Sequence, residues 1–234
     1  FDLEEKLSWD HEIPDKMGKW WIDVMTEAIK VELLKVPRGI QPGKAIGSPM
    51  LVGFCDGAQT AYAAAIYVRW EIKEPICVES NDEALSSVDK NGSRFSATLL
   101  CSKAKVTPAG GHSTPKSELN SATLLSRLMK SAVHAMAVTP SNVICAGDSQ
   151  CVISSLEHST SRFKPYFQNR ISEIKESFDI MKETCPVEDF AYIPGNINPA
   201  DLVTRTDGKL EDIGINSEWQ LSLIHISEPT RPAI

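Results

Sequence analysis

Four carboxylates stand where a predicted strand ends or a predicted helix begins. Asp56 follows the apolar run LVGFC and Asp148 follows VICAG, whereas Glu118 and Asp201 open predicted helices in SELNSATLL and NPADLVTR. Carboxylates brought together at short range repel one another, and divalent cations with a preference for oxygen ligands, above all Mg²⁺, relieve that repulsion. Two such ions about 4 Å apart can activate water and stabilise the leaving oxygen of a phosphodiester. If these side chains meet, the sequence indicates metal-dependent phosphodiester hydrolysis.

Each carboxylate also has an ordinary structural interpretation. Asp56 precedes a glycine, and Asp-Gly is a common hairpin signal. Asp148 could cap the helix that follows it. Glu118 and Asp201 could be first-turn charges favoured by the helix dipole. The structural interpretation must hold for all four residues at once, so the four residues together favour a shared metal-binding site.

The elements that would position these residues follow from hydrophobic periodicity. Three strands come first, a long helix and a short buried strand follow, and two helices, a last strand and a final helix complete the order β-β-β-α-β-α-α-β-α. A three-stranded meander followed by βα alternation implies a mixed sheet with helices on its faces. The predicted ranges are Met50–Cys55, Ala61–Trp70, Phe95–Val106, Ser117–Met136, Asn142–Asp148, Ser149–Glu157, Phe167–Thr184, Asp189–Pro194 and Asn198–Arg205.

Three segments lie outside this pattern. Residues 1–47 read as polar and helical, with WWIDVMTEAIKVELL at helical spacing and PRGIQPGKAIGSP as a linker. Residues 73–92 are polar without periodicity and are predicted to form an inserted loop. The tail LSLIHISEPTR resembles the conceptual translation of a sequencing adapter, so residues 221–234 are excluded from the fold prediction.

Composition narrows the class of protein. The chain has 234 residues, of which 42% are hydrophobic and 24% charged, and no apolar run approaches the roughly 18 residues of a membrane span. Six cysteines form no CxxC pair, which predicts reduced thiols, an intracellular location and no structural zinc. The net charge of −7 argues against a general nucleic-acid coat but leaves room for a local basic groove.

Several short sequence motifs of the chain closely resemble those of one protein family. GFCDGAQTAYAAAIYVR, CSKAKVTP, TPKSELNSATLL, AGDSQCVI, KPYFQNRISEI and IPGNINPADLVTR are similar to successive segments of BEL/Pao-type retrotransposon polyproteins. The order Asp, Glu, Asp, Asp on these elements resembles the retroviral ribonuclease H fold. The resemblance covers about residues 51–205.

The resemblance implies a fold and a division of the chain. It implies an α/β, ribonuclease H-like mixed five-stranded sheet with helices on both faces, preceded by a short helical connection segment. Residues 1–47 would connect to a reverse transcriptase, and residues 48–210 would form the ribonuclease H-like domain. Residues 211–220 would begin a downstream linker, before the adapter-like residues 221–234.

The resemblance also implies an activity. Asp56, Glu118, Asp148 and Asp201 would be the catalytic metal ligands for two Mg²⁺ ions, with Mn²⁺ as a substitute. They would cleave the RNA strand of an RNA–DNA hybrid during reverse transcription, beside the polymerase of the same polyprotein and in a cytoplasmic virus-like particle. No membrane and no small-molecule cofactor is expected. Many relatives carry a histidine in the loop before the last aspartate, whereas residues 195–199 here contain none.

Hybrid binding would need a locally basic face. Basic side chains would meet phosphates, and small polar groups could meet 2′-hydroxyls, without reading sequence. Lys103 and Lys105 alternate on a strand, so they could equally be its solvated face. The candidates are Ser102, Lys103, Lys105, Lys116, Lys164, Asn169 and Arg170, with Arg162 and Tyr166 in the same RFKPYFQNR segment.

Two other functions stay open. A non-catalytic connection domain would keep the fold and support the polymerase, and its mark would be loss of the acidic ligands, all of which remain. An aspartic peptidase needs paired Asp-Thr/Ser-Gly turns whose aspartates share one proton. Asp56-Gly57-Ala58 lacks the hydroxyl residue, and neither DTG nor DSG occurs in the chain.

Overall fold

The computed structural model describes residues 10, 12–29, 39–73, 87–88, 94–108, 113–158 and 163–204. The chain divides into two compact units, Phe1–Val36 and Pro37–Ile234. In the first unit, helix α1 (Asp15–Ile29) has no buried residue. Among the described helices, none is both long enough and apolar enough to cross a membrane.

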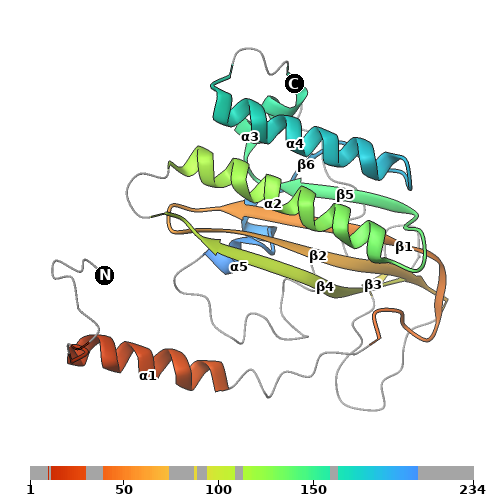
Figure 1. Ribbon diagram of the computed structural model, residues 1–234. Helices are drawn as coiled ribbons and strands as arrows, with labels where there is room; N and C mark the ends of the chain where they lie inside the picture. The colour runs from red at the N-terminus through yellow and green to blue at the C-terminus, as the bar shows by residue number, and fades with distance from the viewer. Residues whose placement is uncertain are drawn as a thin grey trace. The chain divides into compact units, whose positions relative to one another are not determined.

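The second unit is built on one mixed β-sheet, shown in Figure 1. Strand β1 lies inside the sheet, antiparallel to β2 on one side and parallel to β5 on the other. The order across the sheet is β3-β4-β2-β1-β5-β6. The strands are β1 (Ala45–Gly57), β2 (Ala61–Ile72), β3 (Ser87–Val88), β4 (Arg94–Val106), β5 (Asn142–Gly147) and β6 (Ala191–Tyr192).

Helices cover both faces of this sheet. The long helices α2 (Thr114–Ala135) and α4 (Pro165–Lys182) lie on one side with α3 (Gln150–Glu157), as Figure 1 shows. The short helix α5 (Asp201–Thr204) contacts β1 and β2 from the other side, after a 3₁₀ turn at Gly195–Ile197.

Alternation along β1 explains why both faces are covered. Leu51 and Cys55 join the core cluster under α2, whereas Val52 and Phe54 join the cluster that contains Ala200 beside α5. Successive side chains of a strand point to opposite faces, so a strand that is apolar on both must be covered on both. The continuous run of apolar residues in β1 therefore indicates a strand in the interior of the sheet.

The predicted mixed sheet with helices on both faces is confirmed, with three local corrections. Residues 45–49 were predicted to be linker but belong to β1, where the register shifts between Ile46 and Met50 and Gly47 has a φ of 67°. A left-handed glycine permits such a bulge, so the glycine marked an irregular strand. Ser87 and Val88, inside the predicted inserted loop, form the short strand β3 against β4.

The last predicted strand is shorter than expected. Of Asp189–Pro194, Ala191 and Tyr192 form the ladder with β5. The chain also meets β5 just before this segment, through an isolated bridge between Val187 and Val143. The predicted segments at 211–220 and 221–234 lie outside the described residues, and so does most of 73–92.

Candidate active site

Two of the four carboxylates lie side by side at the ends of neighbouring parallel strands. Cys55 of β1 pairs with Gly147 of β5, and Asp56 and Asp148 are the next residues along each strand. Neighbouring strands are about 4.8 Å apart, so the two side chains leave the sheet at adjacent points. The carboxyl ends of parallel strands are where ligands bind in α/β sheets.

Glu118 reaches this point because the start of α2 is pressed against the end of β1. A Cβ at Gly57 would lie 2.4 Å from the Glu118 backbone nitrogen and 2.4 Å from the Ser117 carbonyl carbon. Real side chains are never that close to backbone atoms, so only glycine permits the contact. The Asp-Gly pair is therefore not the hairpin turn: the reversal follows it, where Ala58 N donates to Ala61 O at 2.8 Å.

Asp201 is brought to the same end by a buried asparagine. Asn198, fully buried, donates from Nδ2 to the carbonyl oxygen of Cys55 at 3.0 Å, one residue before Asp56. Its own carbonyl accepts from the Asp201 N–H at 3.1 Å. The loop before Asn198 also approaches closely, because a Cβ at Gly195 would lie 3.0 Å from Asp148 Oδ2. This loop thus fastens α5 to β1 and leaves space for the Asp148 carboxylate.

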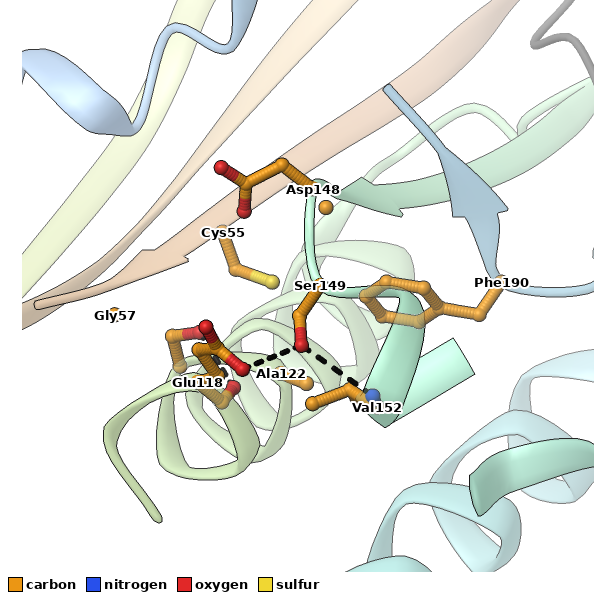
Figure 2. Close-up of a pocket in the computed structure, with 10 residues that line it drawn as sticks. Cys55, Gly57, Glu118, Ala122, Asp148, Ser149, Val152 and Phe190 are labelled. Atoms are coloured by element: carbon orange, nitrogen blue, oxygen red, sulfur yellow. Dashed lines mark hydrogen bonds between the residues drawn. The ribbon is translucent and has the colours of Figure 1, made fainter. Parts of the chain in front are cut away.

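Two hydroxyl groups bind two of the carboxylates. Ser149 Oγ donates to Glu118 Oε2 at 2.5 Å, as Figure 2 shows, and Thr204 Oγ1 donates to Asp56 Oδ2. Ser149 also accepts from Val152 N, which makes it the N-cap of α3. The alternative in which Asp148 caps that helix is wrong, because the residue after it takes this position and leaves the Asp148 carboxylate for the cluster.

The carboxylates interact electrostatically as one group. Burial first, and then the charges of Asp56, Glu118 and Asp201, raise the pKa of Asp148 from 3.8 to about 6. A hydrogen bond from backbone acts in the opposite direction but does not cancel these effects. All three other carboxylates are therefore near enough to oppose ionisation of Asp148.

A small pocket lies between Asp148 and Glu118. Figure 2 shows the Cys55 thiol and the Phe190 ring at its wall, and its volume is about 10 Å³, room for about one water molecule. Burial raises the pKa of Cys55 to about 12, so its thiol stays neutral at physiological pH. Cys55 therefore lines the pocket without contributing a thiolate ligand.

The four carboxylates are chemically suited to bind a hard divalent cation, but their side chains are not yet arranged around a common ligand position. Four carboxylates supply oxygen ligands, and both causes of the raised pKa of Asp148, burial first and then the neighbouring charges, oppose an ionised carboxylate that a bound cation would stabilise. Yet in the part of the chain that the structure describes, no three His, Cys, Asp or Glu side chains are already arranged to hold a metal ion.

Three of the predicted nucleic-acid contacts gather at the N-terminal ends of α2 and α4. Lys116 Nζ lies 5.8 Å from the centre of the Tyr166 ring, and the Arg170 guanidinium lies 5.7 Å from it. The Tyr166 hydroxyl donates to Asn120 Oδ1 at 2.7 Å, which fixes the ring between the two cations. Arg170 also pairs with Glu173 at 3.1 Å. This arrangement is a partly neutralised basic cluster close to Glu118 in sequence, in which Tyr166 is exposed and Lys116 and Arg170 are half-buried.

The other predicted contacts are exposed but less concentrated. Lys164 and Asn169 lie at the start of α4 and are exposed. Lys103 and Lys105 pair with Ala64 and Tyr62 of β2, residues of the core cluster under α2, so these lysines lie on the α2 face of the sheet. Ser102 is exposed on the same strand, whereas Arg162 lies outside the described residues.

Sequence reasoning missed the supporting residues. Ser149, Thr204, Asn198 and Gly57 contact the carboxylates or the backbone beside them, yet each looked like an ordinary cap, turn or helix residue. The available signals were adjacency and spacing, since Ser149 follows Asp148 directly and Thr204 lies three residues after Asp201. Neither signal shows which carboxylate the hydroxyl binds, because the two partners are far apart in the chain.

The topology and the carboxylate cluster define a ribonuclease H-like α/β domain. Residues 3–79 and 84–149, more than half of the chain, match the family described as the Pao retrotransposon-like RNaseH-like domain. The chain belongs to this family. The matched residues include Asp56, Glu118 and Asp148, and they end before Asp201.

Solved structures with similar folds share little sequence with the chain. The N-terminal RNase H domain of rv2228c from Mycobacterium tuberculosis is 13% identical over 64% of this chain and 86% of its own, with a TM-score of 0.41. RNase H1 from the archaeon Halobacterium salinarum NRC-1 is 12% identical over 66% and 91%, with a TM-score of 0.35. LC11-RNase H1 in complex with an RNA/DNA hybrid is 12% identical over 65% and 91%, with a TM-score of 0.38. None of the curated proteins compared with the chain matches it.

The raised pKa of Asp148 predicts how metal-free stability depends on pH. Because the folded-state pKa (about 6) exceeds the ordinary value of 3.8, the folded state binds this proton more tightly, and stability is lost as pH rises through about 6. Asp148→Asn removes the charge. In EDTA it should therefore melt at a higher temperature than the wild type at pH 8, and the difference should shrink as pH falls below 6.

The matched control is Asp179→Asn, which neutralises an exposed carboxylate on α4. The melting temperature of this control, measured by circular dichroism, should differ little from that of the wild type, and the difference should be nearly constant between pH 5 and 8. An Asp148→Asn protein less stable than the wild type at pH 8 without metal would contradict the repulsive cluster.

Proposed function

We propose that the protein is the ribonuclease H-type endonuclease of a BEL/Pao retrotransposon. Its substrate is the RNA strand of an RNA–DNA hybrid, and hydrolysis depends on two divalent metal ions, Mg²⁺ or Mn²⁺. The working partner is the reverse transcriptase domain of the same polyprotein, which makes the hybrid. Family membership supports the retrotransposon setting.

One observation supports catalysis above all others. The charges of Asp56, Glu118 and Asp201 all act on Asp148, although the four residues come from four separate elements of the chain. A fold gains no stability from gathering like charges at a partly buried point. The arrangement is explained if a cation is bound there in the working protein.

The role of each residue follows from its position. Asp56 and Asp148, at the ends of adjacent strands, would supply carboxylate oxygens to a divalent cation. Glu118 and Asp201, on α2 and α5, would complete the ligands from the two sides. When bound, the paired ions would activate the attacking water and stabilise the leaving oxygen of the phosphodiester.

The substrate interface proposed here is the basic cluster at the start of α2 and α4, extended by the lysines of β4. Lys116, Tyr166 and Arg170 lie on the same side of the sheet as Glu118, and Lys103 and Lys105 face the same side. Lysine and arginine would bind phosphates, while the exposed Asn169 could meet 2′-hydroxyl groups. Ser102 alternates with Lys103 on β4 and therefore faces the opposite side of the sheet. Such contacts position a duplex without reading its sequence.

A non-catalytic connection domain is the second candidate. The observation in its favour is that the described carboxylates are not already arranged to hold a metal ion. All four acidic residues nevertheless remain, and their mutual repulsion remains with them. The aspartic peptidase alternative has no support, because Asp56 lies within a strand and its neighbours lack the hydroxyl residue of the peptidase turn.

Substitution of the two central carboxylates tests the proposed activity. Asp56→Asn and Asp148→Asn should each reduce Mg²⁺-dependent cleavage of a labelled RNA–DNA hybrid to the background of EDTA-treated enzyme, because each removes a ligand charge while preserving shape. Circular dichroism should show that both variants remain folded. Asp179→Asn, a control on the exposed side of α4, should cleave at the wild-type rate.

Full activity in both carboxylate variants would reject the nuclease. A folded wild-type protein with no cleavage in Mg²⁺ or Mn²⁺ would instead support the connection domain.

Removal of one basic side chain tests the interface. Lys116→Ala should weaken hybrid binding several-fold in fluorescence anisotropy at low salt. It should also reduce the slope of log affinity against log salt concentration by about 1, because one phosphate contact is lost. Lys182→Ala, at the other end of α4, is the matched control and should leave both quantities unchanged. Equal behaviour of the two variants would place the duplex elsewhere.

A further inference from the structure

Two hydroxyl groups connect the carboxylates in pairs across separate elements. Ser149 directly follows Asp148, and its hydroxyl binds the Glu118 carboxylate on α2. Thr204 shares helix α5 with Asp201, and its hydroxyl binds the Asp56 carboxylate on β1. Each hydroxyl therefore belongs to the segment that carries one acid and donates to the acid of another segment.

Each hydrogen bond engages one oxygen of its carboxylate. Ser149 donates to Oε2 of Glu118 and Thr204 donates to Oδ2 of Asp56, so neither contact involves the second oxygen of its carboxylate. A hydrogen bond to one oxygen orients the plane of a carboxylate and leaves the other oxygen able to bind a cation.

Without such contacts the cluster would tend to open. Like charges at short range repel, and a glutamate side chain can rotate away into water at little cost. Thr204 is buried, with 7% of its surface exposed, so its hydroxyl stays directed at Asp56. Ser149 is held by its place as the N-cap of α3, where it accepts from Val152 N.

We propose that Ser149 and Thr204 are positioning residues that hold Glu118 and Asp56 in place for a divalent cation before it binds. The inference rests on the proposed function, because it concerns affinity for the catalytic metal. It goes further by assigning roles to two residues that are not themselves ligands. The hydroxyls raise metal affinity because less ordering remains to be done when the ion arrives.

The test must separate positioning from simple structural support. Ser149 also caps α3, and Thr204 Oγ1 also lies 3.1 Å from the Asp201 carbonyl oxygen. Ser149→Gly removes the hydroxyl at a position where glycine is a tolerated N-cap, and Thr204→Val preserves shape. Ser149→Thr and Thr204→Ser keep a hydroxyl group and should therefore retain the metal affinity of the wild type.

A buried hydroxyl outside the cluster supplies the control. Thr123 on α2 donates to the Leu119 carbonyl oxygen at 2.8 Å and is buried. Thr123→Val therefore removes a buried hydroxyl of the same kind without touching a carboxylate. Any general loss of stability is measured for every variant as the melting temperature in EDTA.

The experiment is a titration of the whole protein with MnCl₂ by isothermal calorimetry, with no nucleic acid present. Ser149→Gly and Thr204→Val should each weaken Mn²⁺ binding about tenfold, whereas Ser149→Thr, Thr204→Ser and Thr123→Val should stay within about twofold of the wild type. This readout is independent of cleavage.

Each outcome has a distinct meaning. Unchanged or tighter Mn²⁺ binding in both hydroxyl-free variants, with wild-type binding intact, overturns the positioning role and leaves the nuclease proposal standing. Weaker binding in the hydroxyl-retaining variants as well would show that packing rather than the hydrogen bond matters, and it also overturns the role. Failure of the wild type to bind Mn²⁺ rejects both proposals.

Discussion

Repulsion among four carboxylates at one end of the sheet is the interaction on which the rest of the structure depends. Burial and the charges of the other three carboxylates together raise the pKa of Asp148 to about 6, so ionisation of this group is disfavoured where it stands. An isolated patch of acids would spread into water, since nothing in its own chemistry draws it together. The surrounding fold must therefore supply the stability that holds these side chains in place.

That stability comes from close backbone packing and from a buried hydrogen bond. The glycine at position 57 lets the start of α2 meet the end of β1 at backbone distance, which places Glu118 beside Asp56. On the opposite face, the buried Asn198 side chain fastens the segment before α5 to the Cys55 carbonyl oxygen. Apolar clusters pack against both faces of β1, so this strand is held firmly in place, and all four acids are positioned relative to it. The site is thus positioned by the same contacts that stabilise the domain.

The sequence was sufficient for the arrangement of elements, and it was insufficient for the contacts among the four acids. Hydrophobic periodicity located β1, β2, β4, β5 and the long helices, because each buries a strongly patterned face. It failed at Gly47, which looked like linker but permits a bulge in β1. The hairpin alternative that the sequence left open for Asp56-Gly57 is excluded, because this pair ends the strand.

The supporting residues were beyond sequence reasoning for a physical reason. The hydroxyl of Thr204 and the carboxylate of Asp56 are separated by 148 residues, and only packing brings them together. The same holds for Asn198 and the Cys55 carbonyl oxygen, which are 143 residues apart. Single-residue signals such as a helix cap or an Asx turn describe what a residue does locally, so they do not identify a distant partner.

The central claim is that this repulsion exists to be neutralised by paired divalent cations. The most direct measurement is an anomalous difference map from crystals of the protein grown with MnCl₂, recorded at the manganese absorption edge. We expect two peaks about 4 Å apart, each bound by oxygens from among Asp56, Glu118, Asp148 and Asp201. A map at saturating Mn²⁺ with no peak among these four carboxylates, or with manganese bound only by other residues, would contradict the central claim.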